Sequence, residues 1–233
     1  MKKIIIAIDG FAGCGKSTTA QLVAEKLDYI YITTGAMYRA TTLYFLRNAI
    51  PFEKENEKMQ QALREMRIEL KVEGEHPVAQ TYLNGQHVED ELRTPEVNAN
   101  VSPVSVHPMV RKEMVRQQRM IGKNGGIVMD GRDIGTVVFP EAELKIFMTA
   151  DVWIRAKRRL QEMEERGIET NLEEVVENLK ERDRIDTTRK QSPLKQAEDA
   201  VVIDTTHLTI PEQVEMVCKL AMEKMIEINK VEN

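Results

Sequence analysis

The sequence predicts an α/β fold in which a sheet is layered with helices. An apolar, β-branched run at residues 3–8, bounded by Asp9 and Gly10, is typical of a buried parallel strand. Further short apolar runs alternate along the chain with segments of helical periodicity, which is the pattern of a layered α/β sheet. With 233 residues and 42% hydrophobic composition, the chain can bury a substantial core, as one domain or as a domain carrying an insertion.

The first part of the chain supplies two strands and two helices. After the run at residues 3–8 we expect a helix at 16–27, a short strand near 29–32 and a second helix at 35–46. The second helix has apolar or small side chains at helical spacing, namely Met37, Ala40, Thr41, Tyr44 and Phe45.

Residues 51–100 interrupt this alternation. A polar helix is predicted at 54–66, and three short alternating segments follow at 68–74, 78–83 and 86–90. The last two segments flank Asn84-Gly85, a pair that favours a type I′ turn because both central residues need positive φ. We therefore expect a small antiparallel sheet, inserted into a core formed by residues 1–50 and 101–233.

The alternation resumes after the insertion. The expected elements are a helix at 108–122, strands at 126–129 and 143–148, helices at 152–165 and 170–186, a strand at 200–203 and a closing helix from about residue 210. Capping boxes are predicted at two helix starts, Thr170 with Glu173 and Thr209 with Glu212. The closing helix has one apolar face, formed by Val214, Val217, Cys218, Ala221, Met225 and Ile228.

Charge and hydropathy narrow the range of partners. The chain has 38 acidic and 33 basic residues and a net charge of −5, so it offers no overall field for a nucleic-acid polymer or an acidic membrane. No stretch approaches the ~20 apolar residues that span a bilayer, and Asp9 interrupts the N-terminal run before it can form a signal peptide. Two cysteines make no disulfide framework. We therefore expect a cytoplasmic protein, and a monomer because no segment presents an apolar interface.

Residues 10–17 read GFAGCGKS, which satisfies the phosphate-loop pattern Gly-x-x-x-x-Gly-Lys-Ser. The glycines let backbone N–H groups surround a phosphate, and the helix that begins near Lys16 adds its positive end. The Lys16 ammonium can reach the β- and γ-phosphates, and the Ser17 hydroxyl can ligate Mg²⁺. The sequence therefore predicts ATP or GTP binding by a loop comprising Gly10, Phe11, Ala12, Gly13, Cys14, Gly15, Lys16, Ser17 and Thr18. Within it, Cys14 is expected to be a small filler rather than a redox group.

The rest of the sequence separates the classes of nucleotide-binding protein. A GTPase reads guanine with Asn-Lys-x-Asp, whereas the nearest approach is NKVE at 229–232, which ends in a different acid. A motor ATPase usually carries oligomerising or nucleic-acid surfaces, which this acidic chain does not show. A kinase of a small acceptor needs a second anion site. Arginines at loop and helix positions are candidates for that site: Arg39, Arg93, Arg111, Arg132, Arg182, Arg184 and Arg189.

Arg132 is the strongest of these candidates. It lies in the stretch DGRD at 130–133, directly after an apolar strand, where ligands bind in open α/β sheets. Its planar guanidinium can bind phosphate bidentately. Acidic and basic residues are balanced between residues 155 and 190, so an average arginine of that stretch is expected to decorate a solvated helix instead.

Six stretches resemble the bacterial cytidylate kinases, a family with the P-loop nucleoside monophosphate kinase fold. They are IDGFAGCGKSTTA (8–20), TTGAMYRA (33–40), YLNGQHVEDELRTPEV (82–97), DGRDIGTVVFPEAELKIFM (130–148), KERDRIDTTR (180–189) and VVIDTT (201–206). The similarity is collinear over nearly the whole chain. It implies phosphoryl transfer from ATP, with Mg²⁺, to CMP or dCMP. It also implies a three-layer P-loop NTPase core with a parallel five-stranded sheet, a monophosphate-binding insert at about 51–100 and a helical lid at about 155–169.

The resemblance also assigns site residues. It places Ser102, Arg111 and Asp133 around the cytosine, Arg39, Arg132 and Arg189 at the CMP phosphate, Asp186 and Arg182 at the sugar, and Thr34 and Tyr38 along the acceptor site. The catalytic residues that it implies are Lys16, Arg132, Arg189 and, in the lid, Arg158.

Elementary chemistry agrees with the assignment of Asp133 to the base. Cytosine presents an amino donor at N4, from which a carboxylate can accept, whereas uracil would turn its O4 toward the carboxylate and be repelled. The chain departs from the family at Phe11, where Pro is frequent, and at Thr33-Thr34, where Asp-Ser is frequent. Thr34 keeps the hydroxyl, while Thr33 lacks the carboxylate that Asp would supply.

Several alternatives stay open at this level. Four basic residues of the lid segment could close over the ATP phosphates, or form a charged helix face with Glu162, Glu165 and Glu169; they are Arg155, Lys157, Arg158 and Arg159. Asp9 is expected to fix loop geometry. Asp130 is expected to hold its turn, with organisation of Mg²⁺ or water as the alternative. A kinase of another small acceptor and a non-catalytic nucleotide-binding protein remain as other functions.

Overall fold

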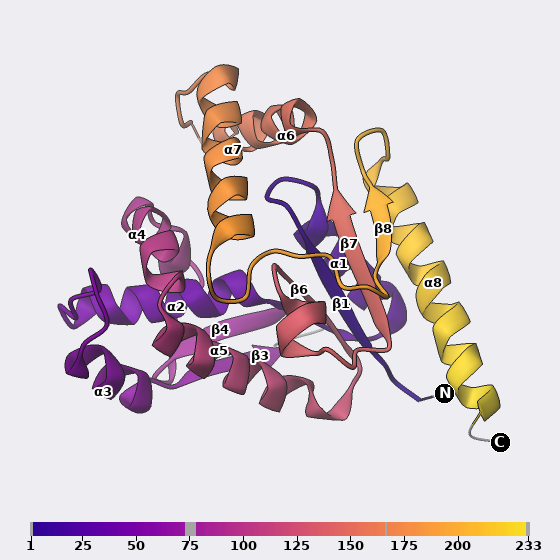
Figure 1. The fold of residues 1–233 in the computed structure, drawn as a ribbon, viewed down its shortest axis with the longest axis horizontal. Coiled ribbons are helices and arrows are strands. Elements are labelled where there is room, and N and C mark those ends of the chain that lie inside the picture. Colours follow the sequence, from indigo (N-terminus) through magenta and orange to yellow (C-terminus); the bar gives the residue numbers. More distant parts are fainter. Residues whose placement is uncertain (1, 73–77, 166, 232–233) are drawn as a thin grey trace.

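The computed structural model describes residues 2–72, 78–165 and 167–231, and its centre is a five-stranded sheet in the order β2-β6-β1-β7-β8 (Figure 1). The strands are β1 (Ile5–Gly10), β2 (Ile30–Thr33), β6 (Ile127–Gly131), β7 (Leu144–Thr149) and β8 (Val201–Asp204). Every pairing in this sheet is parallel. The expected parallel five-stranded sheet is therefore confirmed.

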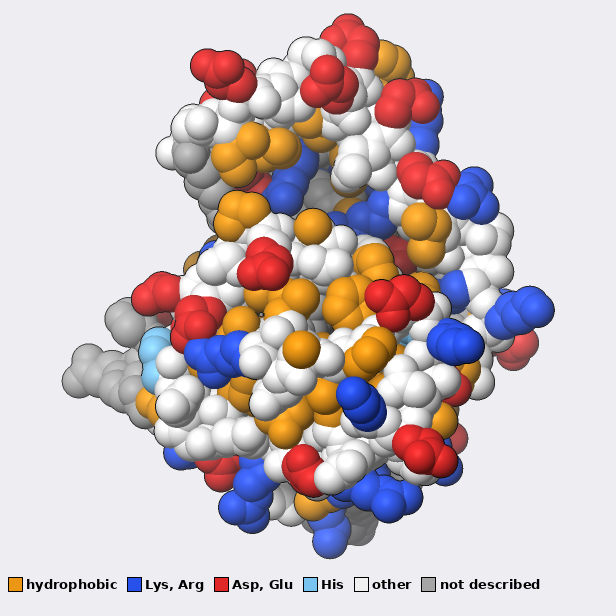
Figure 2. All heavy atoms as spheres, turned by 90° about the vertical axis from the view of Figure 1, so that its left-hand side faces the viewer, with side chains coloured by type: hydrophobic (Ala, Val, Ile, Leu, Met, Phe, Trp, Pro, Cys, Tyr) orange, Lys and Arg blue, Asp and Glu red, His pale blue; other side chains and the backbone are white. Residues whose placement is uncertain are grey.

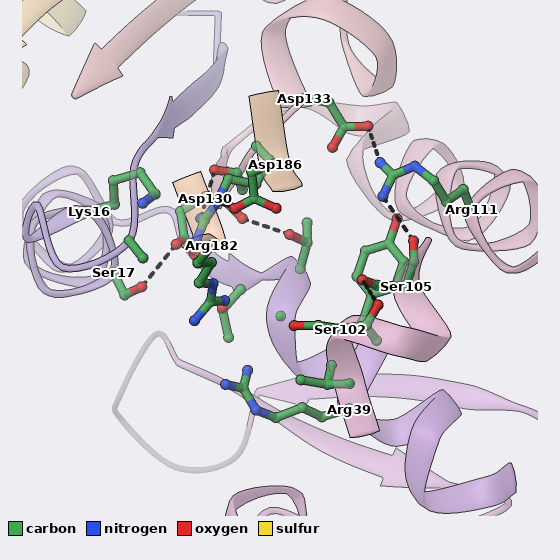
Figure 3. A pocket seen from close by; sticks show the side chains of 18 of the residues that line it. Lys16, Ser17, Arg39, Ser102, Ser105, Arg111, Asp130, Asp133, Arg182 and Asp186 are labelled. Atoms are coloured by element: carbon green, nitrogen blue, oxygen red, sulfur yellow. Dashed lines mark hydrogen bonds and ion pairs between the residues drawn. The ribbon is translucent and has the colours of Figure 1, made fainter. Parts of the chain in front are cut away.

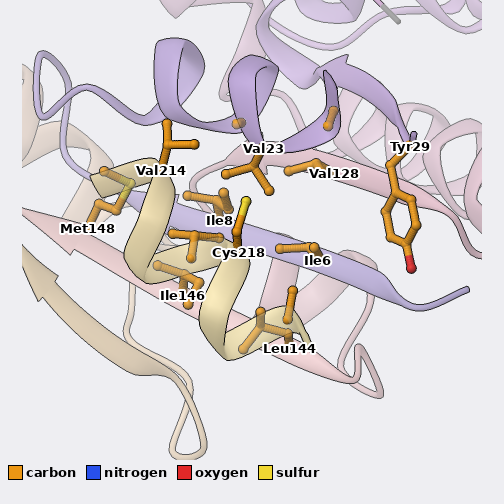
Figure 4. Packing of buried hydrophobic residues seen from close by; sticks show 14 of the residues in the cluster. Ile6, Ile8, Val23, Tyr29, Val128, Leu144, Ile146, Met148, Val214 and Cys218 are labelled. Carbon is orange, nitrogen blue, oxygen red and sulfur yellow. The ribbon is translucent and has the colours of Figure 1, made fainter. Parts of the chain in front are cut away.

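Helices cover both faces of the sheet and so complete three layers. They are α1 (Lys16–Leu27) and α8 (Ile210–Val231) on one face and α5 (Pro108–Ile121) on the other. On the first face Ile6 and Ile8 of β1 pack against Val23 of α1 and Cys218 of α8 (Figure 4). The residues that alternate with these along the strands face the other way. Met129 of β6, for example, lies in the apolar cluster on the second face of the sheet. Because the central strands β1 and β6 are buried on both faces, they are continuous apolar runs rather than alternating ones.

A second lobe extends from one end of the sheet and corresponds to much of the expected insertion (Figure 1). It contains α2 (Thr34–Arg47), α3 (Glu57–Glu65), α4 (Pro95–Ser105) and the antiparallel strands β3 (Ile68–Val72), β4 (Ala79–Leu83) and β5 (Gln86–His87). Phe45, Met59 and Leu83 lie in its buried cluster. Asn84 and Gly85 have φ of 50° and 80°, which confirms the predicted hairpin turn. Residues 73 and 74 of the predicted segment 68–74 lie outside the described residues.

Helix α4 is not evident from the sequence. Pro103 lies inside it, and its residues alternate between apolar and small polar side chains without a clear helical stripe. The helix forms because Val97 and Val104 are buried in the cluster of the second lobe, so tertiary packing outweighs weak local propensity. It also crosses residue 100, the expected end of the insertion.

One helix cap differs from its prediction. The helix α7 (Leu172–Thr188) is capped by Asn171, whose side chain accepts a hydrogen bond of 2.9 Å from the Glu174 N–H. Thr170, the predicted cap, instead bonds the Glu174 side chain. The capping box at α8 is confirmed, because Thr209 N–H donates to Glu212 Oε2 at 2.7 Å.

Helices α6 (Val152–Glu164) and α7 stand beyond the carboxyl ends of the strands, above the rest of the sheet (Figure 1). A small apolar cluster that includes Ala12, Ala156 and Val176 packs them against the phosphate loop. Arg166 of the expected lid segment lies outside the described residues. None of the helices in the described parts of the chain is long and apolar enough to cross a membrane.

Candidate active site

A cavity of about 240 Å³ lies at the carboxyl ends of β1, β2 and β6. Its walls come from segments far apart in the chain, from Ala12 in the phosphate loop to Arg189 after α7. All ten residues predicted to bind the acceptor line it: Thr34, Tyr38, Arg39, Ser102, Arg111, Arg132, Asp133, Arg182, Asp186 and Arg189. Figure 2 shows Lys and Arg side chains in the depth of the hollow beneath the upper part of the molecule.

The cavity has two chemically distinct ends (Figure 3). Lys16 and Ser17 of the phosphate loop lie at one end, while Asp133 and Arg111 lie at the other. Between them are guanidinium groups and the carboxylates of Asp130 and Asp186. The cavity thus joins a phosphate-loop end to an end formed by an ion pair, with cationic side chains between them.

The phosphate loop takes its conformation from glycines. Gly10 ends β1 with φ of 145°, and a Cβ there would lie 1.9 Å from the carbonyl oxygen of Met148. Gly15, with φ of 90°, precedes α1 and supplies no side-chain cap. The first N–H groups of α1 are therefore left for an anion, as expected of a phosphate-binding helix start. Of the nine predicted loop residues, Ala12, Gly13, Lys16 and Ser17 line the cavity.

Lys16 is buried at 5% exposure beneath this loop. Its ammonium donates to the Phe11 carbonyl oxygen at 2.6 Å and contacts the Cys14 sulfur at 3.7 Å. Burial lowers the pKa of Lys16, because the charged form is poorly solvated there. A phosphate in the loop would supply the counter-charge that this site lacks. The Cys14 thiol is buried and donates to the Phe11 carbonyl oxygen at 3.0 Å, as expected of a filler.

Asp130 does more than hold the turn that the sequence favoured. Its Oδ2 accepts from the Ser17 hydroxyl at 2.9 Å and its Oδ1 from the Tyr31 hydroxyl at 2.9 Å. Its backbone carbonyl accepts from the Thr34 hydroxyl at 2.9 Å. The parallel pairing of β1 with β6 sets Asp130 opposite Ile8, just before the loop. The carboxylate therefore points at the phosphate loop, which favours the alternative expectation that Asp130 helps to organise Mg²⁺ or water.

The Ser17 hydroxyl and the Asp130 carboxylate fit a magnesium ion. Both are hard oxygen donors, they lie 2.9 Å apart, and both line the cavity beside Lys16. Mg²⁺ usually binds through one or two carboxylates together with substrate phosphates and water rather than in an all-protein cage. In the described residues no group of three or more His, Cys, Asp or Glu side chains is placed to hold a metal.

At the opposite end, Arg111 Nη2 donates to Asp133 Oδ2 at 2.5 Å. Arg111 also donates to the Ser105 carbonyl oxygen at 3.3 Å, and its guanidinium lies 5.5 Å from the centre of the Tyr38 ring. Burial raises the pKa of Tyr38 to about 12. Within the described residues, the buried Nε of Arg111 and Nη2 of Arg189 have no hydrogen-bond partner. Unused donors of this kind are costly unless a ligand meets them.

Arg132, Asp186 and Arg189 form a network between the two ends. Arg132 Nε donates to Asp186 Oδ2 at 2.8 Å, and Arg189 Nη1 lies 3.5 Å from Asp186 Oδ1. Burial opposes the charge of both partners. The pairing prevails, so the pKa of Arg132 is raised and that of Asp186 is lowered. Asp186 therefore stays ionised and holds two arginines in place.

Arg39 and Arg182 are the least satisfied cations of the cavity. Arg182 makes no hydrogen bond or ion pair within the part of the chain that the structure describes, and Arg39 makes only a 3.4 Å hydrogen bond to Asn98. Enclosure by the cavity walls and the neighbouring charge of Arg132 lower the pKa of Arg182 to about 10. Enclosure and Arg93 likewise lower the pKa of Arg39. An anion between these two side chains would relieve both effects.

Asp9 fixes the loop that follows DGRD. Its two carboxylate oxygens accept from the N–H groups of Ile134 and Gly135, each at 2.7 Å. Burial raises its pKa to about 6. These contacts lie on the acceptor side of the site, because Asp133 directly precedes them, and not in the phosphate loop whose geometry Asp9 was expected to fix.

The structure does not bring Arg158 into the cavity. Arg158 donates to the Thr205 carbonyl oxygen at 2.7 Å, and Thr205 in turn donates to the Cys14 carbonyl oxygen behind the phosphate loop. Arg155 is also tied down, donating to the Ala12 carbonyl oxygen and to Asp183. Periodicity alone could not distinguish these positions, since the packing of α6 decides which of its faces is covered.

Three residues at the site were not singled out from the sequence. Val101 and Ser105 line the cavity from α4, the helix without a sequence signal. Tyr31 contacts the site from β2. In the sequence its neighbours indicate only a buried strand. Its polar group is the one signal that could have found it, because a buried tyrosine hydroxyl needs a partner.

The chain is similar in sequence to known proteins over nearly its whole length. The chain matches the family described as cytidylate kinase over residues 6–223. It is 52% identical over 217 residues to a cytidylate kinase of Bacteroides fragilis, covering 92% of this chain and 95% of that protein. It is 50% identical over 235 residues to a cytidylate kinase of Cytophaga hutchinsonii, covering both chains completely.

A solved structure of an uncharacterized protein from Eubacterium ventriosum has the same fold. Its TM-score is 0.50 at 14% identity, with 95% of this chain and 99% of that chain covered. The similarity in sequence, in contrast, extends over nearly all of the chain at about half of its positions. The chain therefore belongs to the cytidylate kinase family.

Proposed function

We propose that this protein transfers the γ-phosphoryl group of ATP to CMP and dCMP, giving ADP with CDP or dCDP. The observation that carries the proposal is the single cavity that joins a phosphate loop to a buried Asp133–Arg111 pair. Membership of the cytidylate kinase family supports the same activity, which its relatives carry in their names.

At the donor end the loop N–H groups and Lys16 bind the β- and γ-phosphates of ATP. The neighbouring Ser17 hydroxyl and Asp130 carboxylate would hold Mg²⁺. When bound, Mg²⁺ neutralises charge on the β- and γ-phosphate oxygens. The Lys16 ammonium exchanges its bond to the Phe11 carbonyl oxygen for a phosphate, which restores the charge pairing that burial denies it.

At the centre, arginines receive the phosphate of the acceptor. Arg39 and Arg182 have donors to spare, and Arg132 is held by Asp186 with its remaining N–H groups beside them. Two phosphorylated molecules repel each other, so the reaction depends on neutralising and aligning them. Arg132 and Arg189 supply part of that positive charge, and Asp186 orients both. The resemblance implies that Arg182 binds the sugar; because it has no hydrogen-bond or ion-pair partner among the described residues, we propose that it can also meet the neighbouring phosphate.

At the far end, Asp133 and Arg111 read the base. Asp133 Oδ2 is occupied by Arg111, while Oδ1 has only a 3.9 Å contact with Arg189. Oδ1 can therefore accept from the N4 amino group of cytosine. The unused Arg111 Nε and Arg189 Nη2 are donors available to the acceptor atoms of the cytosine or to the phosphate of CMP. Uracil would place O4 against Oδ1 and leave that oxygen without a donor.

We also propose that residues 155–169 act as a lid on a core formed by 1–50 and 101–233, with the insertion at about 51–100 binding the monophosphate. Arg159 supports this assignment, since it lines a hollow next to the cavity together with Arg39 and Arg182. For Arg158 to reach ATP, the lid must break its bonds to Thr205. Lid closure is a common way to exclude water from phosphoryl transfer.

The cellular setting is proposed as well. We infer a cytoplasmic monomer that binds ATP, Mg²⁺ and CMP or dCMP but no nucleic-acid polymer and no membrane. Both cysteines are free thiols, which suits a reducing compartment. Light scattering of the purified protein with and without substrates will give its mass; a dimer mass would overturn the monomer.

A coupled assay of ADP release tests the activity. The protein is given ATP and Mg²⁺ with CMP, dCMP, UMP, AMP or no acceptor. We expect fast ADP release with CMP and dCMP and little with the others. Equal turnover with UMP would refute the base assignment. Release without an acceptor would indicate an ATPase, and ATP binding without any acceptor-dependent release would indicate a non-catalytic binding protein.

A further inference from the structure

Tyr31 touches the candidate metal site without lining the cavity. The residue lies in β2 and is 5% exposed, with its ring in the apolar cluster beneath α1 and α8. Its hydroxyl donates to Asp130 Oδ1 at 2.9 Å, while the Ser17 hydroxyl donates to Oδ2 of the same carboxylate at 2.9 Å. Tyr31 is not among the residues that line the cavity, and its hydroxyl is bound to Asp130, so we expect its effect on the reaction to pass through that carboxylate.

The register of the sheet explains how Tyr31 reaches Asp130. Strand β2 pairs in parallel with β6, setting Tyr31 beside Val128 and Thr33 beside Asp130. The long side chain of Tyr31 bridges this offset of two positions, because its hydroxyl donates to Asp130 Oδ1. A shorter residue in β2 would leave Asp130 Oδ1 without a donor.

The contact has a specific physical consequence. Rotation about the last bond of an aspartate side chain is soft, so an unanchored carboxylate samples a wide range of orientations. A donor on Oδ1 restricts that rotation and keeps Oδ2 directed at Ser17. The phenol is neutral, so it orients Asp130 without cancelling its charge, as a lysine or arginine would. The carboxylate keeps its attraction for a divalent cation.

We propose that Tyr31 is a positioning residue that orients the Asp130 carboxylate toward Ser17 and the magnesium ion of bound MgATP. The inference rests on the proposed function, since it assumes that Ser17 and Asp130 hold that ion. Hydrogen-bond partners of metal ligands typically alter metal affinity by about 10- to 100-fold when removed. The loss of one hydroxyl from β2 therefore weakens metal binding in a cavity that Tyr31 does not enter.

The test is Tyr31→Phe, with Tyr29→Phe as the matched control. Tyr29 is also buried, at 3% exposure, and its hydroxyl accepts from the Ile4 N–H at 3.0 Å and donates to the Met225 sulfur. Both variants keep the aromatic ring and lose one buried hydroxyl. Only the hydroxyl of Tyr31 contacts Asp130. Thermal melts establish that each variant is folded.

Metal affinity is measured directly rather than through turnover. Mn²⁺ is titrated, with electron paramagnetic resonance detection, into protein saturated with a non-hydrolysable ATP analogue and no acceptor. We expect Tyr31→Phe to bind Mn²⁺ about 10-fold or more weakly and Tyr29→Phe to match the unaltered protein. In turnover assays, the Mg²⁺ concentration for half-maximal rate should rise for Tyr31→Phe, whereas the KM for CMP should not change.

A double-mutant cycle with Asp130→Asn separates positioning from a general structural effect. In the Asp130→Asn protein, Tyr31→Phe should produce no further loss of Mn²⁺ affinity. Additive losses, equal losses in both tyrosine variants, or unchanged affinity in Tyr31→Phe would each overturn the proposal. The metal titration needs no acceptor, so it stands even if CMP turnover fails and the proposed function falls.

Discussion

Arg111 and Asp133 form a buried ion pair at the end of the cavity farthest from the phosphate loop. Their closest atoms are 2.5 Å apart, and the two side chains are only 3% and 7% exposed. One comes from α5 and the other from the residues after β6. A buried pair of this kind contributes little net stability, but removing one partner is costly. We attribute its place in the cavity wall to the second carboxylate oxygen, Asp133 Oδ1, which can still accept a hydrogen bond from a ligand.

Asp133→Asn tests base recognition while keeping the shape of the side chain. We expect kcat/KM for CMP to fall by roughly 10- to 100-fold, because a charged acceptor becomes an amide and loses about 1.5–3 kcal/mol. The preference for CMP over UMP should narrow, and ATP affinity should not change. The control is Asp199→Asn, an acid paired with Lys145 outside the cavity. An unaltered CMP:UMP ratio in Asp133→Asn would refute the assignment.

Arg132→Lys tests the bidentate geometry at the phosphate. Lysine keeps the charge but cannot bond Asp186 and a phosphate at once through a planar fork. We expect kcat to fall by about 100-fold or more, with ATP affinity changed little. Arg116→Lys is the control, since Arg116 is an exposed partner of Glu113 on α5. Full turnover by Arg132→Lys would reject a catalytic role for the guanidinium.

Asp9→Asn should change how stability depends on pH. Burial raises the pKa of Asp9 from 3.8 to about 6, so the folded protein favours the protonated form. The associated stability is fully present below pH ~4 and is lost as the pH rises through about 6, a fall on the order of 3 kcal/mol. Asparagine does not titrate in this pH range, so the unfolding free energy of Asp9→Asn should not show this fall. Urea unfolding of both proteins between pH 4 and 7 measures the difference, and parallel curves would contradict the prediction.

Gly10→Ala should disrupt the phosphate loop. Its Cβ would lie 1.9 Å from the Met148 carbonyl oxygen, at a φ of 145°. We expect a loss of more than about 3 kcal/mol in unfolding free energy, since backbone must move, together with loss of ATP binding. Gly85→Ala is the control: it also has positive φ, but its Cβ meets no atom of the described residues within 4 Å, so the cost should be about 1–2 kcal/mol. If Gly10→Ala and Gly85→Ala have similar unfolding free energies in denaturant, the phosphate loop tolerates a side chain at position 10.

The elements that could be predicted are those with a strong local pattern. The strand at β1, the glycine-rich loop and the start of α1 follow from apolar runs, turn chemistry and helix periodicity, which depend on neighbours in the chain. The Asn84-Gly85 turn was predictable for the same reason. Helix α4 has no such pattern. It forms because Val97 and Val104 are buried in the apolar cluster of the second lobe.

The partners of charged side chains required the tertiary fold. Arg132 and Arg158 are both arginines flanked by polar residues, yet one lines the cavity and the other is bound to Thr205. Likewise Asp130 looked like a turn residue until β1 and β2 brought Ser17 and Tyr31 to its two oxygens. Short-range sterics and periodicity make strands, helices and the phosphate loop legible in the residues themselves. Which charges meet depends instead on strand order and helix packing, because segments more than a hundred residues apart become neighbours only when the sheet assembles.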